Sequence, residues 1–155
     1  MSEITCKEIQ LNEEILSCLI GFSRDWEKED STYGYRANTK EDIEGNRIFV
    51  AEKEGRIVAY LFGHPEHSEN MRSIMKEGTL FFEVEELYVI PEERNQGIGT
   101  KLFQYLEENL AEEEYIVLST ATKNYRSILH FYLDELDMEF WSARLFKKIK
   151  KGNSI

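Results

Sequence analysis

The chain is 155 residues long, with 41% hydrophobic and 32% charged residues and a formal net charge of −11. This composition is ordinary for one globular domain, which we expect to span residues 1–155, and no apolar run approaches the roughly 20 residues that cross a bilayer. The negative charge disfavours nucleic acid and anionic membranes as partners, and the first residues lack the pattern of a signal peptide, so we expect a cytoplasmic protein.

The N-terminal part of the sequence predicts a strand, a helix and a polar segment. Residues 4–10 alternate between apolar and polar side chains, as in a half-buried strand. Asn12 is a good helix cap, and apolar residues recur at helical spacing from there to Ile20. Residues 24–44 are polar with scattered aromatic side chains, which predicts a loop or short helices.

The middle of the chain predicts three strands. The first two cover residues 47–52 and 56–63, and Gly55 between them is typical of a hairpin turn. The run His64-Pro65-Glu66-His67 is expected to end the second strand. Residues 80–90 form the third predicted strand, which is long.

The C-terminal half alternates between helical and strand patterns. We expect a helix over residues 98–110, a strand over 115–120, a helix over 127–136 and a last strand over 140–146. A strand-rich region followed by such an alternation predicts a mixed α/β fold, in which helices cover both faces of a mixed sheet.

The segment from Val89 to Thr100 carries the strongest functional signal. Gly97 and Gly99 remove side chains where the first amides of the following helix point outward, and no Asp or Ser lies there to cap them. Such amides bind anions, and Arg94 adds a positive charge beside them. A tight turn would need the same glycines for steric reasons alone, and this alternative stays open. The fingerprints of P-loop and dinucleotide-binding proteins are both incomplete.

The string from Arg94 to Gly99 has the pattern R/Q-x-x-G-x-G/A and follows a Leu-Tyr-Val-x-Pro run. In these residues, and in the order of its elements, the chain resembles the GCN5-related N-acetyltransferase (GNAT) superfamily. The resemblance implies a central, mixed, largely antiparallel sheet flanked by helices on both faces, and acetyl-CoA as the cofactor. It places the pyrophosphate on the loop amides and the pantetheine arm along the preceding strand. The implied cofactor-binding residues are Leu87, Tyr88, Val89, Arg94, Asn95, Gln96, Gly97, Ile98, Gly99, Thr100 and Asn124.

A second motif of the family, Asn-x-x-small-x-x-aromatic-Tyr, is approximated by Asn124, Ser127, Phe131 and Tyr132, with one extra residue before the tyrosine. Asp137 stands where a glycine is usual. The resemblance implies that Tyr132 is the acid for the departing CoA thiolate. Proton transfer from a tyrosine to a thiolate is uphill by roughly 2 kcal/mol, so a hydrogen bond to the thiolate is the more economical role. Simple packing of Tyr132 in an amphipathic helix is the structural alternative.

The predicted strand over residues 80–90 has an irregular apolar pattern. The apolar face that contains Val84 resumes one residue late, at Leu87. A β-bulge near Glu85 and Glu86 would absorb this slip, and the resemblance implies a bulge whose free amide polarises the thioester carbonyl. A strand that is covered on both faces needs no alternation, which is the alternative.

An amine acceptor requires a base, because deprotonating an amine of pKa about 10.4 at pH 7 costs about 4 to 5 kcal/mol. The resemblance implies that Glu85 supplies this carboxylate, directly or through water. Glu83 is the rival, and each is alternatively an ordinary exposed carboxylate.

These residues and the resemblance together imply an acetyl-CoA-dependent N-acetyltransferase that acts on the primary amine of a small, cationic acceptor or a peptide. The alternative is a non-catalytic acyl-CoA-binding module. The segment on the acceptor side offers aromatic and acidic groups for a cationic amine, namely Trp26, Glu27, Tyr33 and Tyr35. No third ligand accompanies His64 and His67, so we expect no metal site. A homodimer stays open.

Overall fold

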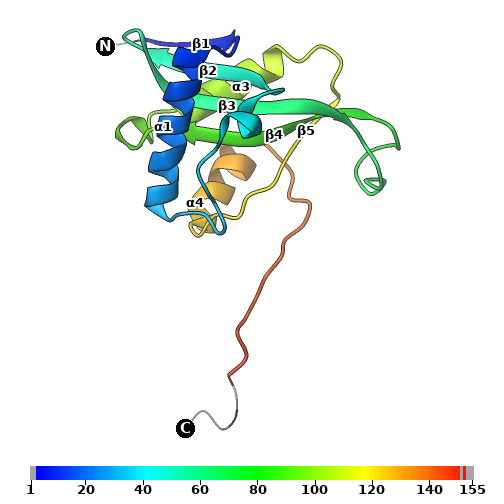
Figure 1. The fold of residues 1–155 in the computed structure, drawn as a ribbon. Coiled ribbons are helices and arrows are strands. Elements are labelled where there is room, and N and C mark those ends of the chain that lie inside the picture. Colours follow the sequence, from blue (N-terminus) through cyan, green and yellow to red (C-terminus); the bar gives the residue numbers. More distant parts are fainter. Residues whose placement is uncertain (1–2, 151, 153–155) are drawn as a thin grey trace.

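The computed structural model describes residues 3–150 and 152, and its centre is a five-stranded sheet in the order β1-β2-β3-β4-β5 (Figure 1). Neighbouring strands are antiparallel except for the last pair, β4 and β5, which is parallel. The strands are β1 (Ile4–Ile9), β2 (Arg47–Lys53), β3 (Arg56–His67), β4 (Leu80–Val89) and β5 (Tyr115–Leu118). The predicted mixed, largely antiparallel sheet is therefore confirmed.

Helices lie on both faces of this sheet, as predicted, with α1 on one face and α3 on the other (Figure 1). The helix α1 begins after Asn12, whose side-chain oxygen accepts a hydrogen bond from the Ile15 amide at 2.8 Å. The helices are α1 (Glu13–Glu29), α2 (Lys40–Ile43), α3 (Ile98–Glu108) and α4 (Tyr125–Leu129), with a 3₁₀ turn at Pro91–Glu93 and a π-helix at His130–Glu135.

Two hydrophobic cores sandwich the sheet, because alternate residues of the central strands point to opposite faces. The core under α3 includes Phe49, Leu61, Phe82, Leu102, Phe103 and Leu106. The core under α1 and α2 includes Leu19, Ile43, Val50, Tyr60, Phe62 and Tyr88. Both faces of β2 and β3 are therefore buried, which explains why the sequences of these strands are nearly continuous apolar runs.

Two elements extend further than the sequence predicts. The helix α1 continues to Glu29 and ends where Asp30 adopts a left-handed conformation with φ of 52°. The strand β3 continues through Pro65 to His67, so the prediction that the run His64-Pro65-Glu66-His67 ends it is wrong. Beyond Gly63, β3 pairs only with β4, and a strand with one free edge tolerates a residue that lacks an amide hydrogen.

The predicted strand over residues 140–146 is wrong. These residues carry no strand or helix assignment, and the chain after Asp137 runs away from the body of the molecule (Figure 1). An apolar alternation forms a strand only where another strand lies beside it, and in the part of the chain that is described none does. Among the same residues, no helix is both long enough and apolar enough to cross a membrane.

Candidate active site

A β-bulge in β4 is the geometric centre of the candidate site, and it confirms the bulge predicted near Glu85 and Glu86. Phe62 pairs with Glu86 and the next residue of β3, Gly63, pairs with Val84, which leaves Glu85 as the extra residue. A Cβ atom at Gly63 would overlap the backbone carbonyl of Glu83. The slip in register therefore requires a glycine opposite the bulge.

Glu85 is exposed and lies against a histidine of the neighbouring strand. Its Oε2 atom is 2.8 Å from Nε2 of His64, and Nδ1 of the same ring is 3.2 Å from Oε1 of Glu66. Burial lowers the pKa of His64, but the hydrogen bond to Glu85 and the charges of both glutamates outweigh it, so the pKa is raised. The ring thus stands between two carboxylates, a contact that the sequence analysis did not predict.

Glu86 is a largely buried carboxylate that the sequence analysis left without a role. Its Oε1 atom accepts hydrogen bonds from the Tyr60 hydroxyl at 2.8 Å and from the Asn38 side-chain amide at 2.8 Å. The Tyr35 hydroxyl donates to the same atom at 3.1 Å. Burial raises the pKa of Glu86, although these donors act in the opposite direction. Glu86 therefore ties the segment before α2 to the sheet.

Glu83, the rival base, has a different setting. It is half-buried, and burial together with the neighbouring Glu85 raises its pKa. It pairs with His64 in the strand register, but it does not line the pocket described next. Of the two candidate bases, only Glu85 has its side chain at that pocket.

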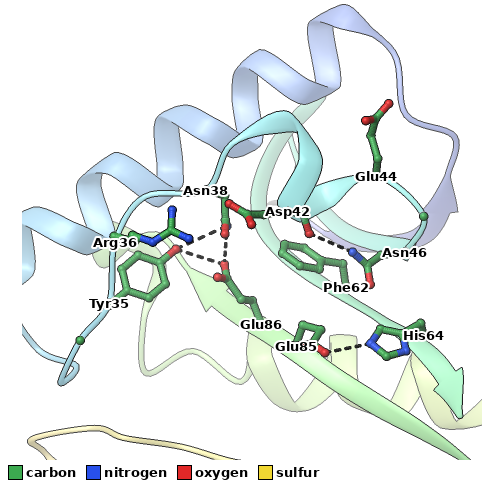
Figure 2. A pocket seen from close by; sticks show the side chains of 12 residues that line it. Tyr35, Arg36, Asn38, Asp42, Glu44, Asn46, Phe62, His64, Glu85 and Glu86 are labelled. Carbon is green, nitrogen blue, oxygen red and sulfur yellow. Dashed lines mark hydrogen bonds and ion pairs between the residues drawn. The ribbon is translucent and has the colours of Figure 1, made fainter.

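A pocket of about 510 Å³ opens between the bulge and the segment that precedes β2 (Figure 2). Its charged lining is mostly acidic, with the carboxylates of Asp42, Glu44, Glu85 and Glu86 against Arg36 and His64. In Figure 2 the side chains of Tyr35 and Asn38 point toward Glu86, on the opposite side of the pocket from His64. A cation is the ligand that this lining favours.

The aromatic cradle expected on the acceptor side does not form. The Trp26 ring stacks on Tyr35 at 4.2 Å and on Tyr88 at 5.2 Å. Trp26 is therefore packed against other aromatic rings of the protein. Tyr33 is exposed and contacts Lys123, whose Nζ lies 5.3 Å from the ring centre, and it does not line the pocket. Of the predicted aromatic side chains, only Tyr35 lines the pocket, and it does so next to Glu86.

The strands β4 and β5 separate on the side of the bulge away from β3. They pair only from Phe81 and Tyr115 to Val84 and Leu118, after which the chain leaves β4 and forms a bridge between Thr122 and Thr32. The Ile90 amide donates to Val58 on β3, so the backbone groups of Leu87 and Val89 face the opposite edge. No strand of the described residues pairs with them there, although the Val89 carbonyl accepts a hydrogen bond from Arg94. This edge is where the pantetheine arm is predicted to pair.

The start of α3 has the uncapped geometry that the sequence predicts. Gly97 is the N-cap with φ of 79°, and no side chain donates or accepts a capping hydrogen bond there. Asn95 is also left-handed, with φ of 62°. Gln96 and Gly97 are exposed, whereas Ile98 is buried in the core. The chain therefore turns sharply into the helix and leaves its first amides without a side-chain partner.

Gly99 serves a packing contact as well as the loop. A Cβ atom there would come within 3.1 Å of the Phe131 ring and 3.7 Å of Val89. The second glycine of the motif thus allows the helix that carries Phe131 to approach α3 closely. A side chain at this position would press on Phe131, so substitutions there test packing as well as ligand binding.

Arg94 is engaged within the protein. It forms a two-pronged pair with the Glu29 carboxylate, at 2.9 and 3.0 Å, and its Nε donates to the Val89 carbonyl at 2.8 Å. Its guanidinium also lies 5.2 Å from the Tyr88 ring centre. The charge of Arg94 is thus already balanced, and its visible role is to hold the loop to the end of α1.

The second motif departs from the family pattern in two ways, and the structure accommodates both. The helix that begins after Asn124 widens into a π-helix at His130–Glu135, which absorbs the extra residue before Tyr132. Asp137 has φ of 57°, the left-handed conformation for which a glycine is usually needed. The motif therefore tolerates the extra residue, and the turn at Asp137 that ends the helix still forms.

Tyr132 lies inside this π-helix, packed against the core and 5.0 Å from the Phe131 ring. Burial raises the pKa of Tyr132 to about 12. Among the described residues, no side chain or backbone group is hydrogen-bonded to its hydroxyl. Asn124 is exposed at the start of α4 and its side chain makes no capping bond, so the roles of both residues stay predictions.

A family profile matches most of this chain, and several solved structures share its fold. The profile of the acetyltransferase (GNAT) family matches residues 13–136. No curated protein sequence matches the chain. Similar structures include a transcriptional regulator from Bacillus halodurans C-125, with 19% identity, a TM-score of 0.69 and coverage of 95% of this chain and 100% of that one.

Two further similar structures are acetyltransferases. An aminoglycoside acetyltransferase, HMB0005, from an uncultured soil metagenomic sample has 16% identity and a TM-score of 0.68, with 96% and 99% of the two chains covered. A ribosomal-protein-alanine N-acetyltransferase from Brucella melitensis biovar Abortus 2308 has 15% identity and a TM-score of 0.58, with 94% and 100% covered. At these identities the likeness concerns the fold.

Proposed function

Because the chain belongs to the GNAT family of acetyltransferases, we propose that it transfers an acetyl group from acetyl-CoA to the primary amine of a small, cationic acceptor or a peptide. One observation carries this proposal. A single strand, β4, contributes the pocket carboxylates at its bulge and the open backbone edge at Leu87 and Val89. Donor and acceptor would thus meet along one rigid element.

The residues of the donor side fit acetyl-CoA. The uncapped amides from Gln96 to Thr100 would receive the pyrophosphate, and the open edge at Leu87 to Val89 would pair with the pantetheine amides. Asn124 lies at the start of the next helix and is a further candidate contact. Acetyl-CoA supplies the activated thioester, and these groups orient it toward the bulge.

On the acceptor side, we propose that Glu85 receives the proton of the attacking amine, directly or through water. His64 is a positioning residue, because both of its ring nitrogens face carboxylates. The ring fixes the orientation of Glu85 through this contact. The acidic lining from Asp42 and Glu44 would attract an acceptor that carries further positive charge.

For the departing thiolate, we propose a hydrogen bond from the Tyr132 hydroxyl. With a tyrosine pKa of about 12, complete proton transfer to a thiolate of pKa about 8.5 would be uphill by roughly 5 kcal/mol. A hydrogen bond needs no such transfer and still stabilises the developing charge. The raised pKa therefore favours the hydrogen-bonding role over full acid catalysis.

A thiol-release assay tests this function. The protein is incubated with acetyl-CoA and a panel of diamines, polyamines, aminoglycosides, amino acids and peptides, and free CoA is measured over time. Release above the amine-free rate, reduced in Glu85→Gln, is the expected outcome. Acetyl-CoA binding by calorimetry without release for any acceptor would instead favour the alternative, a non-catalytic acyl-CoA-binding module.

A further inference from the structure

A second pocket, of about 520 Å³, adjoins the pocket at the bulge. It lies between α2 and the point where the chain enters α1. Both pockets are lined by Glu44 and Gly45, which form the turn between α2 and β2. The two pockets therefore meet at this turn, and a ligand long enough to cross it would occupy both.

The second pocket has an apolar side that the first pocket lacks. Leu11 and Leu16 line it, and both are half-buried against the hydrophobic core under α1 and α2. Its remaining charged residues, Glu13, Lys40 and Glu44, are exposed at the surface. Pockets of this kind hold an apolar group and orient it with a few polar contacts. The carboxylates of the first pocket suit an amine, whereas the leucines of the second suit a hydrocarbon side chain.

The turn between the two pockets presents backbone instead of a side chain. Gly45 is exposed and left-handed, with φ of 82°, and a Cβ atom there would meet nothing within 4 Å. In the part of the chain that is described, neither its amide nor its carbonyl is hydrogen-bonded to the protein. The Glu44 side chain points away from Glu85 and Glu86 (Figure 2). An extended main chain that crosses the turn would therefore find free backbone groups to pair with.

We propose that the acceptor is a peptide that spans both pockets, with its amine at Glu85 and an apolar side chain against Leu11 and Leu16. The inference rests on the proposed function, because it treats the pocket at the bulge as the acceptor site. A small amine fills only that first pocket. A peptide supplies an amine, a main chain that pairs with Gly45 and an apolar side chain in one molecule.

A set of tetrapeptides tests the second pocket. Tetra-alanine and its variants with one leucine at the second, third or fourth position are compared as acceptors in the thiol-release assay. Leucine at one of these positions should raise kcat/KM about tenfold or more over tetra-alanine, because its side chain leaves water. Calorimetry with the same peptides measures binding without turnover and should show the same preference. Equal binding of all four peptides overturns the proposal.

Leu16→Ala should reduce the preference for the leucine peptide to about threefold or less, because the apolar side of the pocket is lost. Ile20→Ala is the matched control on the same helix and should keep the preference. Both side chains are half-buried against the same core, but only Leu16 lines the second pocket. A thermal melt shows whether both variants are folded. An unchanged preference in folded Leu16→Ala overturns the proposal.

Gly45→Asn tests the passage between the two pockets. Asparagine tolerates the left-handed backbone, and its side chain would stand in the open space that the peptide crosses. The affinity for the leucine peptide should fall about tenfold or more. Gly55→Asn is the matched control, because Gly55 has φ of 76°, is equally open and lies in the turn between β2 and β3. Equal affinities of the two variants overturn the proposal.

The assays separate a failure of this proposal from a failure of the proposed function. Thiol release at equal rates with all four peptides would show an acetyltransferase that does not use the second pocket, and would overturn the inference alone. Preferential binding of a leucine peptide without thiol release would support the peptide site and count against the proposed catalysis.

Discussion

The carboxylate of Glu85 lies 2.8 Å from Nε2 of His64, at the point where the register of β3 and β4 slips by one residue. The bulge makes the contact between Glu85 and His64 possible, because Glu85 is the extra residue in β4 and its side chain lines the pocket. The contact joins the residue predicted as base to a histidine that the sequence left without a function.

Glu85→Gln should lower kcat/KM roughly a hundredfold at neutral pH, and high pH should restore part of the loss, since alkali supplies the neutral amine. Glu83→Gln is the matched control on the same strand, and its side chain does not line the pocket. Steady-state rates from pH 6 to 10 for both variants are the measurement. If only Glu83→Gln shows a pH-dependent loss of kcat/KM, the base is Glu83 and the assignment to Glu85 is wrong.

The pKa of His64 should lie above the ordinary value of about 6.5 and should fall when Glu85 is neutralised. A group whose pKa is raised by folding contributes stability that is full below its unfolded pKa and is lost as pH rises through its folded pKa. The pair should therefore stabilise the fold at acidic pH and contribute less in alkali. NMR titration of the ring in the wild type and in Glu85→Gln checks this, and a pKa below 6.5 would mean that burial outweighs the two carboxylates.

Gly97→Asp should bind acetyl-CoA at least tenfold more weakly than Gly97→Asn, a difference of about 1.4 kcal/mol. Asn and Asp have nearly the same shape and both tolerate the left-handed backbone that Gly97 adopts, with φ of 79°. The comparison therefore isolates one negative charge at the predicted pyrophosphate site. Equal affinities by calorimetry would place the pyrophosphate elsewhere.

Gly63→Ala should destabilise the fold by about 1–3 kcal/mol, because its Cβ has no room opposite the bulge. Gly21→Ala is the matched control, since Gly21 lies in α1 with nothing within 4 Å of the added atom, and there alanine should stabilise by up to about 1 kcal/mol. Urea unfolding of both variants measures the difference. If Gly63→Ala leaves the free energy of unfolding unchanged, the bulge can shift to accommodate the added methyl group.

Tyr132→Phe should lower kcat roughly ten- to a hundredfold while the affinity for acetyl-CoA is nearly preserved, because the proposed hydrogen bond would be made mainly to the developing thiolate. The ring and its contact with Phe131 are retained, so the melting temperature should change little. Full activity of Tyr132→Phe would show that Tyr132 has only a structural role.

Local patterns predicted the parts of the site that depend on neighbouring residues. The one-residue slip between Val84 and Leu87 indicated the bulge, and the absence of a capping side chain at Gly97 indicated the exposed start of α3. Each of these features is encoded within a few residues, because the backbone geometry that it needs is local.

Contacts between distant segments could not be predicted in this way. The three donors to Glu86 come from the segment before α2 and from β3, and only the folded chain brings them to one carboxylate. The same limit explains the wrong strand at residues 140–146, because alternation reveals the tendency of a segment and says nothing about whether a partner strand lies beside it.

The Glu29 carboxylate connects the predicted cofactor loop to the chain that leads to the pocket, so binding of the two proposed substrates should be coupled. This carboxylate pairs with Arg94 of the predicted cofactor loop and accepts a hydrogen bond from the Tyr88 hydroxyl at 2.6 Å. The chain that follows Glu29 leads to Tyr35 and Asn38 at the pocket. A phosphate that draws Arg94 away would release Glu29 and loosen the start of that segment. Thermodynamic linkage is reciprocal, so an acceptor that orders the segment would change the affinity for the donor by the same factor.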